Sequence, residues 1–433
     1  MKHTYLLLLL SMLLITSFMS CDKKELFDKE LYRYYIKSNY PVDTLEIDHP
    51  WTLIQRYHVA VTANVKDDNI RELRLYSGHP TLGDGSQSLA QANITTGETV
   101  TVSYDIAQTA TGTLYAALVT REGTTYVTPF AIGQESVNFS SGQITTLSIM
   151  PVTDWQTFTY LFESSFPTPD DFDYNDIVMR IARYAPRNNN LQIRVTLSAV
   201  GSFKQVAGAI RLPGIDYDKV ESVTIIEGKP FDDKYPYNYR KISMSDNLAR
   251  GRSGEAVIRL FEDAHWSLKS EVDELGAVTY KPINTELFAD EDTVTTMPEQ
   301  TRTYNILLKD GVNADSIRLD DLDPFIIQNN ANINFEVHTY KYKFEEVIWE
   351  YLGADKQAYD DYLAWALVIP DNKFLYPVEQ VPIGTYRNGE LYGAYGQYMH
   401  SFGQWARNYR VARDWWQYPN KALVYSKDSQ ETD

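Results

Sequence analysis

The sequence contains very little cysteine, because Cys21 is the only one in 433 residues. A single cysteine excludes a disulfide framework, a cysteine-rich zinc site and a thiol nucleophile deeper in the chain. The zinc-protease pattern His-Glu-x-x-His is also absent, and the histidines show no zinc-ligand spacing. Acidic residues are too numerous for the sequence to single out a hydrolytic pair of carboxyl groups. We therefore expect the protein not to be an enzyme.

Positive charge is also scarce, since 40 basic residues face 58 acidic ones and the formal net charge is −18. Such a balance repels nucleic acid and anionic lipid, so we expect no nucleic-acid partner. Long hydrophobic runs are equally rare. The one near the start, Leu6 to Ile15, is too short to cross a hydrocarbon core of roughly 30 Å.

That short apolar run has the features of a targeting segment. Lys2 provides a positive start, and the small residue Ser20 directly precedes Cys21. These features predict a lipoprotein signal peptide over residues 1–20 and acylation of Cys21. Two or more acyl chains give stable anchoring, so the predicted partner is a membrane that carries the protein on its surface. Residues 21–45 are mixed in charge and are predicted to be a lipidated tether.

Period-two hydrophobic patterning dominates the rest of the chain and predicts an all-β fold. Residues 46–151 are predicted to form an immunoglobulin-like β-sandwich, and residues 152–422 a larger β-sandwich with one or two short C-terminal helices. The helical candidates are 344–351 and 395–407, and 423–433 is expected to be a disordered tail. The alternating segments lie at 59–65, 73–75, 100–104, 114–119, 191–197, 223–226, 256–260, 304–308 and 333–337.

An acidic cluster directly precedes another strand-like stretch, at 177–181. Its members are Asp170, Asp171, Asp173, Asn175 and Asp176. Five oxygen-bearing side chains within seven residues repel one another unless a cation lies among them. Ca²⁺ takes about six to eight oxygen ligands, so the cluster predicts a calcium site. The alternative is an acidic, solvated turn whose side chains cap local backbone groups.

The cluster departs from an EF-hand loop. Counted from Asp171, position six is not glycine, and Ala182 occupies position twelve, where an EF-hand has a bidentate glutamate. The missing ligand must come from elsewhere in the chain. Glu163 is the nearest candidate, and Asp323 or Glu336 are more distant ones. His338, beside Glu336, is expected to be a core residue, with metal ligation as the alternative.

A family resemblance becomes specific at this loop. The segment from Phe162 to Val178 resembles the opening signature of the LruC domain family of bacterial surface lipoproteins. That signature runs approximately Phe-Glu-Asp, then Pro, Gly-Asp, any residue, Asp, an aromatic residue and Asn-Asp before a strand. Ser164 and Asp170 stand where the family has Asp and Gly. The matching residues are Asp171, Asp173, Asn175 and Asp176.

The resemblance continues downstream in the same order, over about residues 155–420. The later matching segments are 322–326, 335–338, 365–370, 376–377 and 414–416. The resemblance implies an outer-membrane lipoprotein of Bacteroidetes-type bacteria, exposed at the cell surface, with no established activity.

The C-terminal aromatic residues permit two interpretations. The spacing of Tyr395, Tyr398, Phe402 and Trp405 is typical of a helix packed on a sheet, whereas an exposed set would form a sugar-stacking platform. We expect a calcium-binding, lipid-anchored surface protein that binds a glycan or a surface protein, for example in adhesion. The alternatives are a structural component of the envelope or of a pilus-like assembly, and a carbohydrate-active enzyme.

Overall fold

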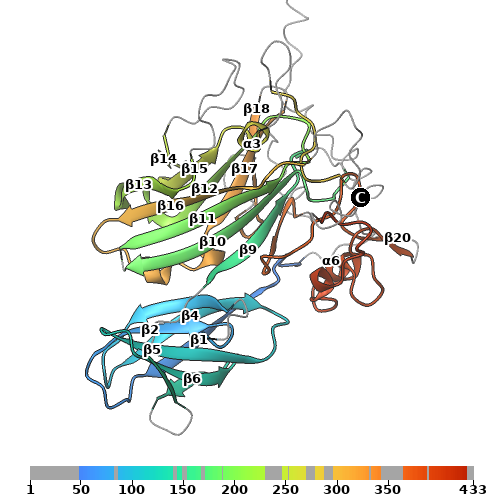
Figure 1. The fold of residues 1–433 in the computed structure, drawn as a ribbon. Coiled ribbons are helices and arrows are strands. Elements are labelled where there is room, and N and C mark those ends of the chain that lie inside the picture. Colours follow the sequence, from blue (N-terminus) through green and yellow to red (C-terminus); the bar gives the residue numbers. More distant parts are fainter. Residues whose placement is uncertain are drawn as a thin grey trace, which may run out of the picture.

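The computed structural model describes residues 48–81, 86–139, 144–148, 154–166, 171–187, 189–229, 246–251, 253–269, 278–286, 296–330, 333–342, 364–387 and 390–426. Within these ranges the chain is predominantly β, with several sheets and only short helices, which confirms the predicted fold class. The predicted signal peptide, Cys21 and the predicted tether lie outside the described residues. Figure 1 shows a smaller β body, drawn in blue and teal, below a larger one.

The smaller body is a sandwich of two sheets. One sheet has the order β4-β1-β7, and the other contains β3-β2-β5-β6-β8. Strand β1 pairs antiparallel with β4 and parallel with β7. The bounds are β1 Ile54–Thr62, β2 Ile70–Tyr76, β3 Gln87–Asn93, β4 Thr99–Ala107, β5 Thr113–Thr120, β6 Thr125–Ala131, β7 Ser136–Asn138 and β8 Thr145–Leu147.

The larger body is a second sandwich. Its first sheet runs β13-β16-β11-β10-β9, with β19 on the far side of β9, and its second runs β14-β15-β12-β17-β18. The first sheet contains β9 Asp154–Phe162, β10 Ile177–Arg187, β11 Asn190–Ala199, β13 Val220–Glu227, β16 Gln300–Leu308 and β19 Ala366–Ile369. The second contains β12 Val206–Asp216, β14 Leu248–Arg250, β15 Glu255–Phe261, β17 Asp323–Asn330 and β18 Ile333–His338.

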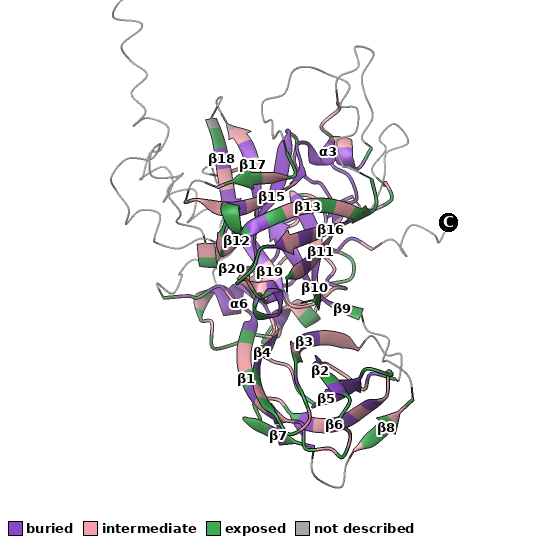
Figure 2. Ribbon diagram, turned by 90° about the vertical axis from the view of Figure 1, so that its left-hand side faces the viewer, coloured by how far each residue is buried: buried purple, intermediate pink, exposed green. Residues whose placement is uncertain are grey.

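Burial follows the hydrophobic pattern of the strands. In β11, Leu191, Ile193, Val195 and Leu197 are fully buried, and the polar residues between them are half-buried. Strand β10 is instead buried on both faces along most of its length, with only Arg180 and Tyr184 half-buried before the exposed last two residues. Figure 2 shows the resulting contrast between the mostly buried larger body and the more exposed edge strands β7 and β8.

The two bodies are joined by strand pairing as well as by the chain. Strand β3 pairs with the start of β9 in parallel through Gln87 and Ser88, so one sheet continues from the smaller body into the larger. Gln156 Nε2 also donates to the backbone oxygen of Asp105 at 2.6 Å.

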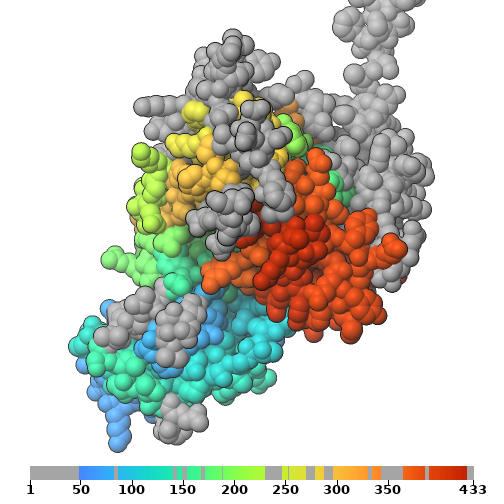
Figure 3. Space-filling model, turned by 45° about the vertical axis from the view of Figure 1, so that its right-hand side comes forward, coloured from blue at the N-terminus to red at the C-terminus, as the bar shows by residue number. Residues whose placement is uncertain are grey.

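The residues after 364 form a layer of short elements on one face of the larger body, drawn orange to red in Figure 3. These elements are the hairpin of β20 Thr385–Arg387 and β21 Glu390–Tyr392, helix α6 Phe402–Arg407 and the 3₁₀ helix η6 Trp415–Gln417. The other short helices are α3 Ala264–Ser267 and the 3₁₀ helices η2 Tyr217–Lys219, η3 Ala314–Ser316, η4 Leu319–Asp321 and η5 Tyr340–Tyr342. Of the helices in the described ranges, none has the length and hydropathy needed to cross a bilayer.

The predicted helix over 395–407 is too long at its start. The structure begins the helix at Phe402, with the hydroxyl of Ser401 capping it by accepting from Gln404 N at 3.1 Å. Tyr395 cannot be helical there, because its backbone N–H donates to Ile383 and its carbonyl accepts from Phe402. The tertiary pairing of Tyr395 thus overrides the local spacing. The helical candidate at 344–351 lies outside the described residues.

Two further details differ from the expectations. The expected disordered tail begins at 423, but Val424 and Tyr425 are buried, and Val424 forms a β-bridge with Pro377. The packed chain therefore continues to at least residue 426. The alternating segments predicted from the sequence also include none within 227–254 or 265–300, yet these stretches contain strand β14 and the partner of a β-bridge between Val200 and Ile283.

A buried ion-pair network connects the strands of the second sheet. Arg211 Nε donates to Asp323 Oδ2 at 2.8 Å, and His338 Nδ1 lies 2.9 Å from the same oxygen. Burial opposes the charge on His338, but Asp323 and Glu336 outweigh it and raise the pKa of His338 to about 9. His338 is therefore a buried residue of an ion-pair network, consistent with its expected place in the core.

Replacing Asp323 with asparagine should destabilise the protein, because the cations of Arg211 and His338 would lose their shared buried counter-charge. We expect a loss of roughly 3–5 kcal/mol in the free energy of unfolding, measured by urea denaturation. The matched control is Asp218→Asn, which breaks the exposed pair with Arg250 and should leave the midpoint unchanged. Equal midpoints for the two variants would contradict the assignment.

Candidate metal centre

The antiparallel pairing of β9 with β10 brings the acidic loop and Glu163 together. Ile177 at the start of β10 pairs with Phe162 at the end of β9, so the residues just beyond each strand end meet. Glu163 follows β9, and Asp176 precedes β10. The backbone N–H of Ser164 donates to Asp176 Oδ2 at 2.5 Å, which closes this end of the strand pair.

Two aromatic residues anchor the acidic loop. Phe172 and Tyr174 are fully buried and have φ angles of 55° and 57°, a left-handed conformation that bulky residues rarely adopt. The ring of Phe172 packs 5.6 Å from that of Trp365, and the hydroxyl of Tyr174 donates to the carbonyl of Ala364 at 2.6 Å. Such strain persists only where the surroundings over-determine it, so these contacts fix the loop in place.

The carboxylates of Glu163, Asp171 and Asp173 converge on one point. One oxygen atom from each lies within 4.8 Å of the other two. Glu163 and Asp173 are buried, and Asp171 is half-buried. Glu163 Oε1 accepts from the backbone N–H of Tyr174 at 2.6 Å, whereas Glu163 Oε2 is buried without a hydrogen-bond partner among the described residues. A buried carboxylate oxygen in that state is costly, and a bound cation would relieve the cost.

A distant segment, residues 377–380, completes the site. Asp173 Oδ2 accepts from the backbone N–H of Gln380 at 2.9 Å, and Asn175 Nδ2 donates to the carbonyl of Pro377 at 3.1 Å. The adjacent Glu379 is held by Thr285, whose hydroxyl donates to Glu379 Oε2 at 3.1 Å.

Gly201 shows how closely the two sides of the site approach. A Cβ atom on Gly201 would lie 2.0 Å from Asn175 Oδ1 and 2.7 Å from Glu379 Oε2. Only glycine fits under these two oxygen atoms, which therefore share one small space. The Gly201 N–H also donates to the carbonyl oxygen atoms of Asn175 and Asp176, which holds the loop against the glycine.

Burial and the repulsion between neighbouring carboxylates raise the pKa values of several acidic side chains in the cluster. Burial, followed by Asp176, Asp173 and Asp171, raises the pKa of Glu163 well above its usual range. Burial, followed by Asp171 and Glu379, does the same to the pKa of Asp173. Burial together with Asp171 and Asp176 raises the pKa of Glu379 to about 8. A divalent cation among these groups would favour their ionised forms and reverse these shifts.

The donor set fits a hard cation. The side chains that converge here offer carboxylate and amide oxygen atoms, the ligands that Ca²⁺ and Mg²⁺ prefer. Glu163, Asp171 and Asp173 could together hold a metal ion, and Glu163 is also the residue whose buried Oε2 has no hydrogen-bond partner among the described residues.

The structure brings together all five residues predicted for the metal site, namely Glu163, Asp171, Asp173, Asn175 and Asp176, at one end of the β9–β10 pair. Asp170 lies outside the described residues.

The distant candidates Asp323 and Glu336 are not at this centre, since both pair with His338 in the second sheet. The prediction that Asp323 or Glu336 supplies a ligand to this centre is therefore wrong. Glu379 was not predicted as a site residue. It carries no local signal, because its segment is placed by hydrogen bonds between residues 202 and 207 positions apart.

The C-terminal aromatics are mainly core residues. Tyr395, Phe402, Trp405 and Trp415 are buried and contact one another, which supports the packing interpretation. Trp415 and Trp416 lie in the 3₁₀ helix η6, with Trp415 buried and Trp416 half-buried. Tyr398 is an exception at 73% exposed.

Fold and site together define a two-sandwich β protein with a buried, oxygen-rich acidic centre suited to a cation. The chain belongs to the family described as "Domain of unknown function (DUF4842)", which matches residues 189–416. The chain is also similar to the crystal structure of a "Putative lipoprotein from Bacteroides ovatus", with a TM-score of 0.48 and 14% sequence identity. That similarity covers 83% of this chain and 100% of the other. No curated protein matches the chain.

The metal-free protein should lose stability as pH rises. Between about 4.5 and 8, folded Glu379 retains a proton that the unfolded chain releases, so the free energy of unfolding falls across this range. Thermal midpoints measured in chelator from pH 5 to 8 should decline, and the decline should be smaller in Glu379→Gln. An identical pH dependence in both proteins would contradict the placement of Glu379.

Proposed function

We propose that this chain is a lipid-anchored cell-surface protein whose larger sandwich binds Ca²⁺ as a structural ion, and that the protein acts in ligand binding or adhesion. The observation that carries the calcium proposal is that Glu163, whose buried Oε2 has no hydrogen-bond partner among the described residues, converges with Asp171 and Asp173. The resemblance of the loop to the LruC domain family supports the surface role.

A structural ion suits this position better than a catalytic one. The centre ties three separate parts of the chain together, because the acidic loop contacts Gly201 on one side and the segment 377–380 on another. Calcium is favoured over magnesium because carboxylate oxygen atoms of Glu163, Asp171 and Asp173 converge here, with oxygen atoms of Asn175 and Glu379 sharing the space beside Gly201. Ca²⁺ accepts six to eight such ligands in flexible geometry, whereas Mg²⁺ demands near-octahedral geometry.

The cavities favour binding over hydrolysis. A glycosidase needs two carboxyl groups flanking its substrate. Among the described residues, a cavity of about 490 Å³ beside Trp51 is lined by a single carboxylate residue, Asp320, and a cavity of about 480 Å³ beside Tyr392 is lined by none. This supports a binding protein as opposed to a carbohydrate-active enzyme.

The anchor is proposed from the sequence. The apolar run before Ser20 and Cys21 supports acylation of Cys21 and attachment to the outer membrane, with the folded part exposed at the surface.

Calcium should raise the thermal midpoint of the mature chain, residues 21–433, relative to chelator. Ligand at about 100 times its Kd adds roughly 2.7 kcal/mol to the free energy of unfolding. Asp173→Asn and Glu379→Gln should lose most of this shift, measured by calorimetry. The matched control Asp310→Asn, at an exposed turn, should keep it. A wild-type protein indifferent to calcium would refute the proposal.

Replacing Cys21 with serine should release the protein from the membrane. Cells fed an alkyne analogue of palmitate should label the wild-type protein in the membrane fraction, and the Cys21→Ser variant should carry no label. Immunoblotting of whole cells controls for expression. Labelling that persists in the variant would show that Cys21 is not the acylated residue.

A further inference from the structure

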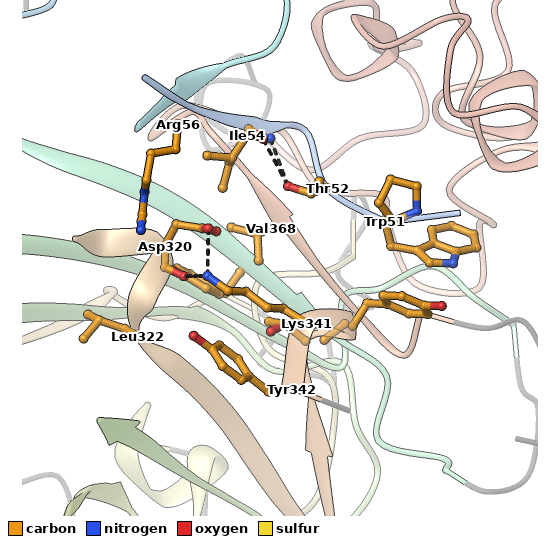
Figure 4. Close-up of a pocket in the computed structure, with 14 residues that line it drawn as sticks. Trp51, Thr52, Ile54, Arg56, Asp320, Leu322, Lys341, Tyr342 and Val368 are labelled. Carbon is orange, nitrogen blue, oxygen red and sulfur yellow. Dashed lines mark hydrogen bonds and ion pairs between the residues drawn. The ribbon is translucent and has the colours of Figure 1, made fainter. Parts of the chain in front are cut away.

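A cavity of about 490 Å³ lies between the segment that enters the smaller sandwich and the larger sandwich. Trp51 and Ile54 line it from the entering chain, Leu322 and Tyr342 from the larger body, and Val368 from β19 (Figure 4). Its volume falls within the roughly 300–1,000 Å³ typical of sites for small molecules. It is separate from the acidic centre, because none of the carboxylates of that centre lines it.

The charged groups around the cavity are already matched. Arg56 donates to Asp105 at 2.7 Å and to Asp321 at 2.8 Å, and Lys341 donates to Asp320 Oδ2 at 3.0 Å. Two cations therefore face three carboxylates. A phosphate, sulfate or carboxylate ligand would have to compete with these carboxylates for the cations, so the charge balance disfavours an anion and favours a neutral ligand.

The cavity also combines aromatic rings with polar groups at its rim. Trp51, Tyr340 and Tyr342 contribute the rings, and Asp320 and Lys341 contribute an acceptor and a donor. A sugar ring has an apolar face of C–H groups and a periphery of hydroxyl groups, so it matches both features. Aromatic faces bury the C–H face of the sugar, and charged groups make strong hydrogen bonds to its hydroxyl groups.

Trp51 is held in position before any ligand arrives. Its φ angle is 48°, and its backbone N–H donates to His49 Nδ1 at 2.9 Å. Its ring packs against Trp405 at 5.4 Å and Phe402 at 6.3 Å. Because Trp51 is already fixed, little conformational entropy is lost when a ligand binds against it, and this raises the affinity.

We propose that this cavity binds a neutral sugar residue of a glycan. The inference rests on the proposed function, since it names the ligand class and the site of the adhesive surface. Calcium binding at the acidic centre can be tested independently of sugar binding, because the two sites share no residue.

The test is binding of the fluorescently labelled mature chain to an array that carries neutral oligosaccharides and their sialylated or sulfated counterparts. We expect the neutral glycans to be bound in preference. Val368→Trp on β19 and Thr52→Phe on the entering chain each place a larger side chain in the lining of the cavity, so each should weaken binding roughly tenfold or more. Thermal unfolding with and without calcium, run on the same samples, establishes that each variant is folded.

The matched control is Tyr392→Ala. Tyr392 is 49% exposed and lines a different cavity of about 480 Å³ near Gly393 and Asn420. This variant should bind like the wild type. Loss of binding in Tyr392→Ala, with binding kept in a folded Val368→Trp, would overturn the assignment and leave glycan adhesion intact. Preference for anionic glycans, or no glycan binding by a protein that still responds to calcium, would overturn the inference alone.

Discussion

The mutual repulsion of carboxylates at one end of the β9–β10 strand pair is the constraint on which the rest of the larger domain depends. Glu163, Asp171 and Asp173 are held within a few ångströms of one another and mostly away from water. Nothing in their local sequence would keep them there. They are held by contacts with distant residues: Phe172 and Tyr174, whose left-handed backbone conformation is strained, are anchored at Trp365 and Ala364, and the loop makes hydrogen bonds to the segment 377–380. A bound cation would neutralise the repulsion between these carboxylates and would link the end of the β9–β10 pair to the C-terminal layer.

The C-terminal layer links this centre to the interdomain cavity. Tyr174 of the acidic loop packs 6.1 Å from Phe402, and Phe402 packs 6.3 Å from Trp51 in the cavity wall. One aromatic cluster therefore supports both the metal loop and the wall of the proposed sugar site. This explains why so many large rings are gathered in a region whose regular secondary structure is limited to one short hairpin and two short helices. The rings fill the space between sites and do not form an exposed stacking platform.

Buried charge has two different roles in the molecule. In the second sheet, Arg211, Asp323 and His338 compensate one another and hold neighbouring strands in register. At the acidic centre, Glu163, Asp171 and Asp173 bring three groups of one charge sign together. The distinction matters because both sets contain carboxylates that looked like equivalent metal-ligand candidates. The cations of Arg211 and His338, which pair with Asp323 and Glu336, identify the second set as a structural network.

The amino-acid sequence was enough to predict the all-β class and the position of the acidic loop, because period-two alternation and the clustering of carboxylates are local properties. The strands at 191–197 and 304–308 follow directly from alternation. Tertiary structure alone decided the position of Glu379, the requirement for glycine at 201 and the late start of helix α6. Each depends on contacts between residues far apart in the chain: Glu379 with Thr285, Gly201 with Asn175, and Tyr395 with Ile383. Residue spacing carries no information about such contacts, because they form only when the sheets and the C-terminal layer pack together.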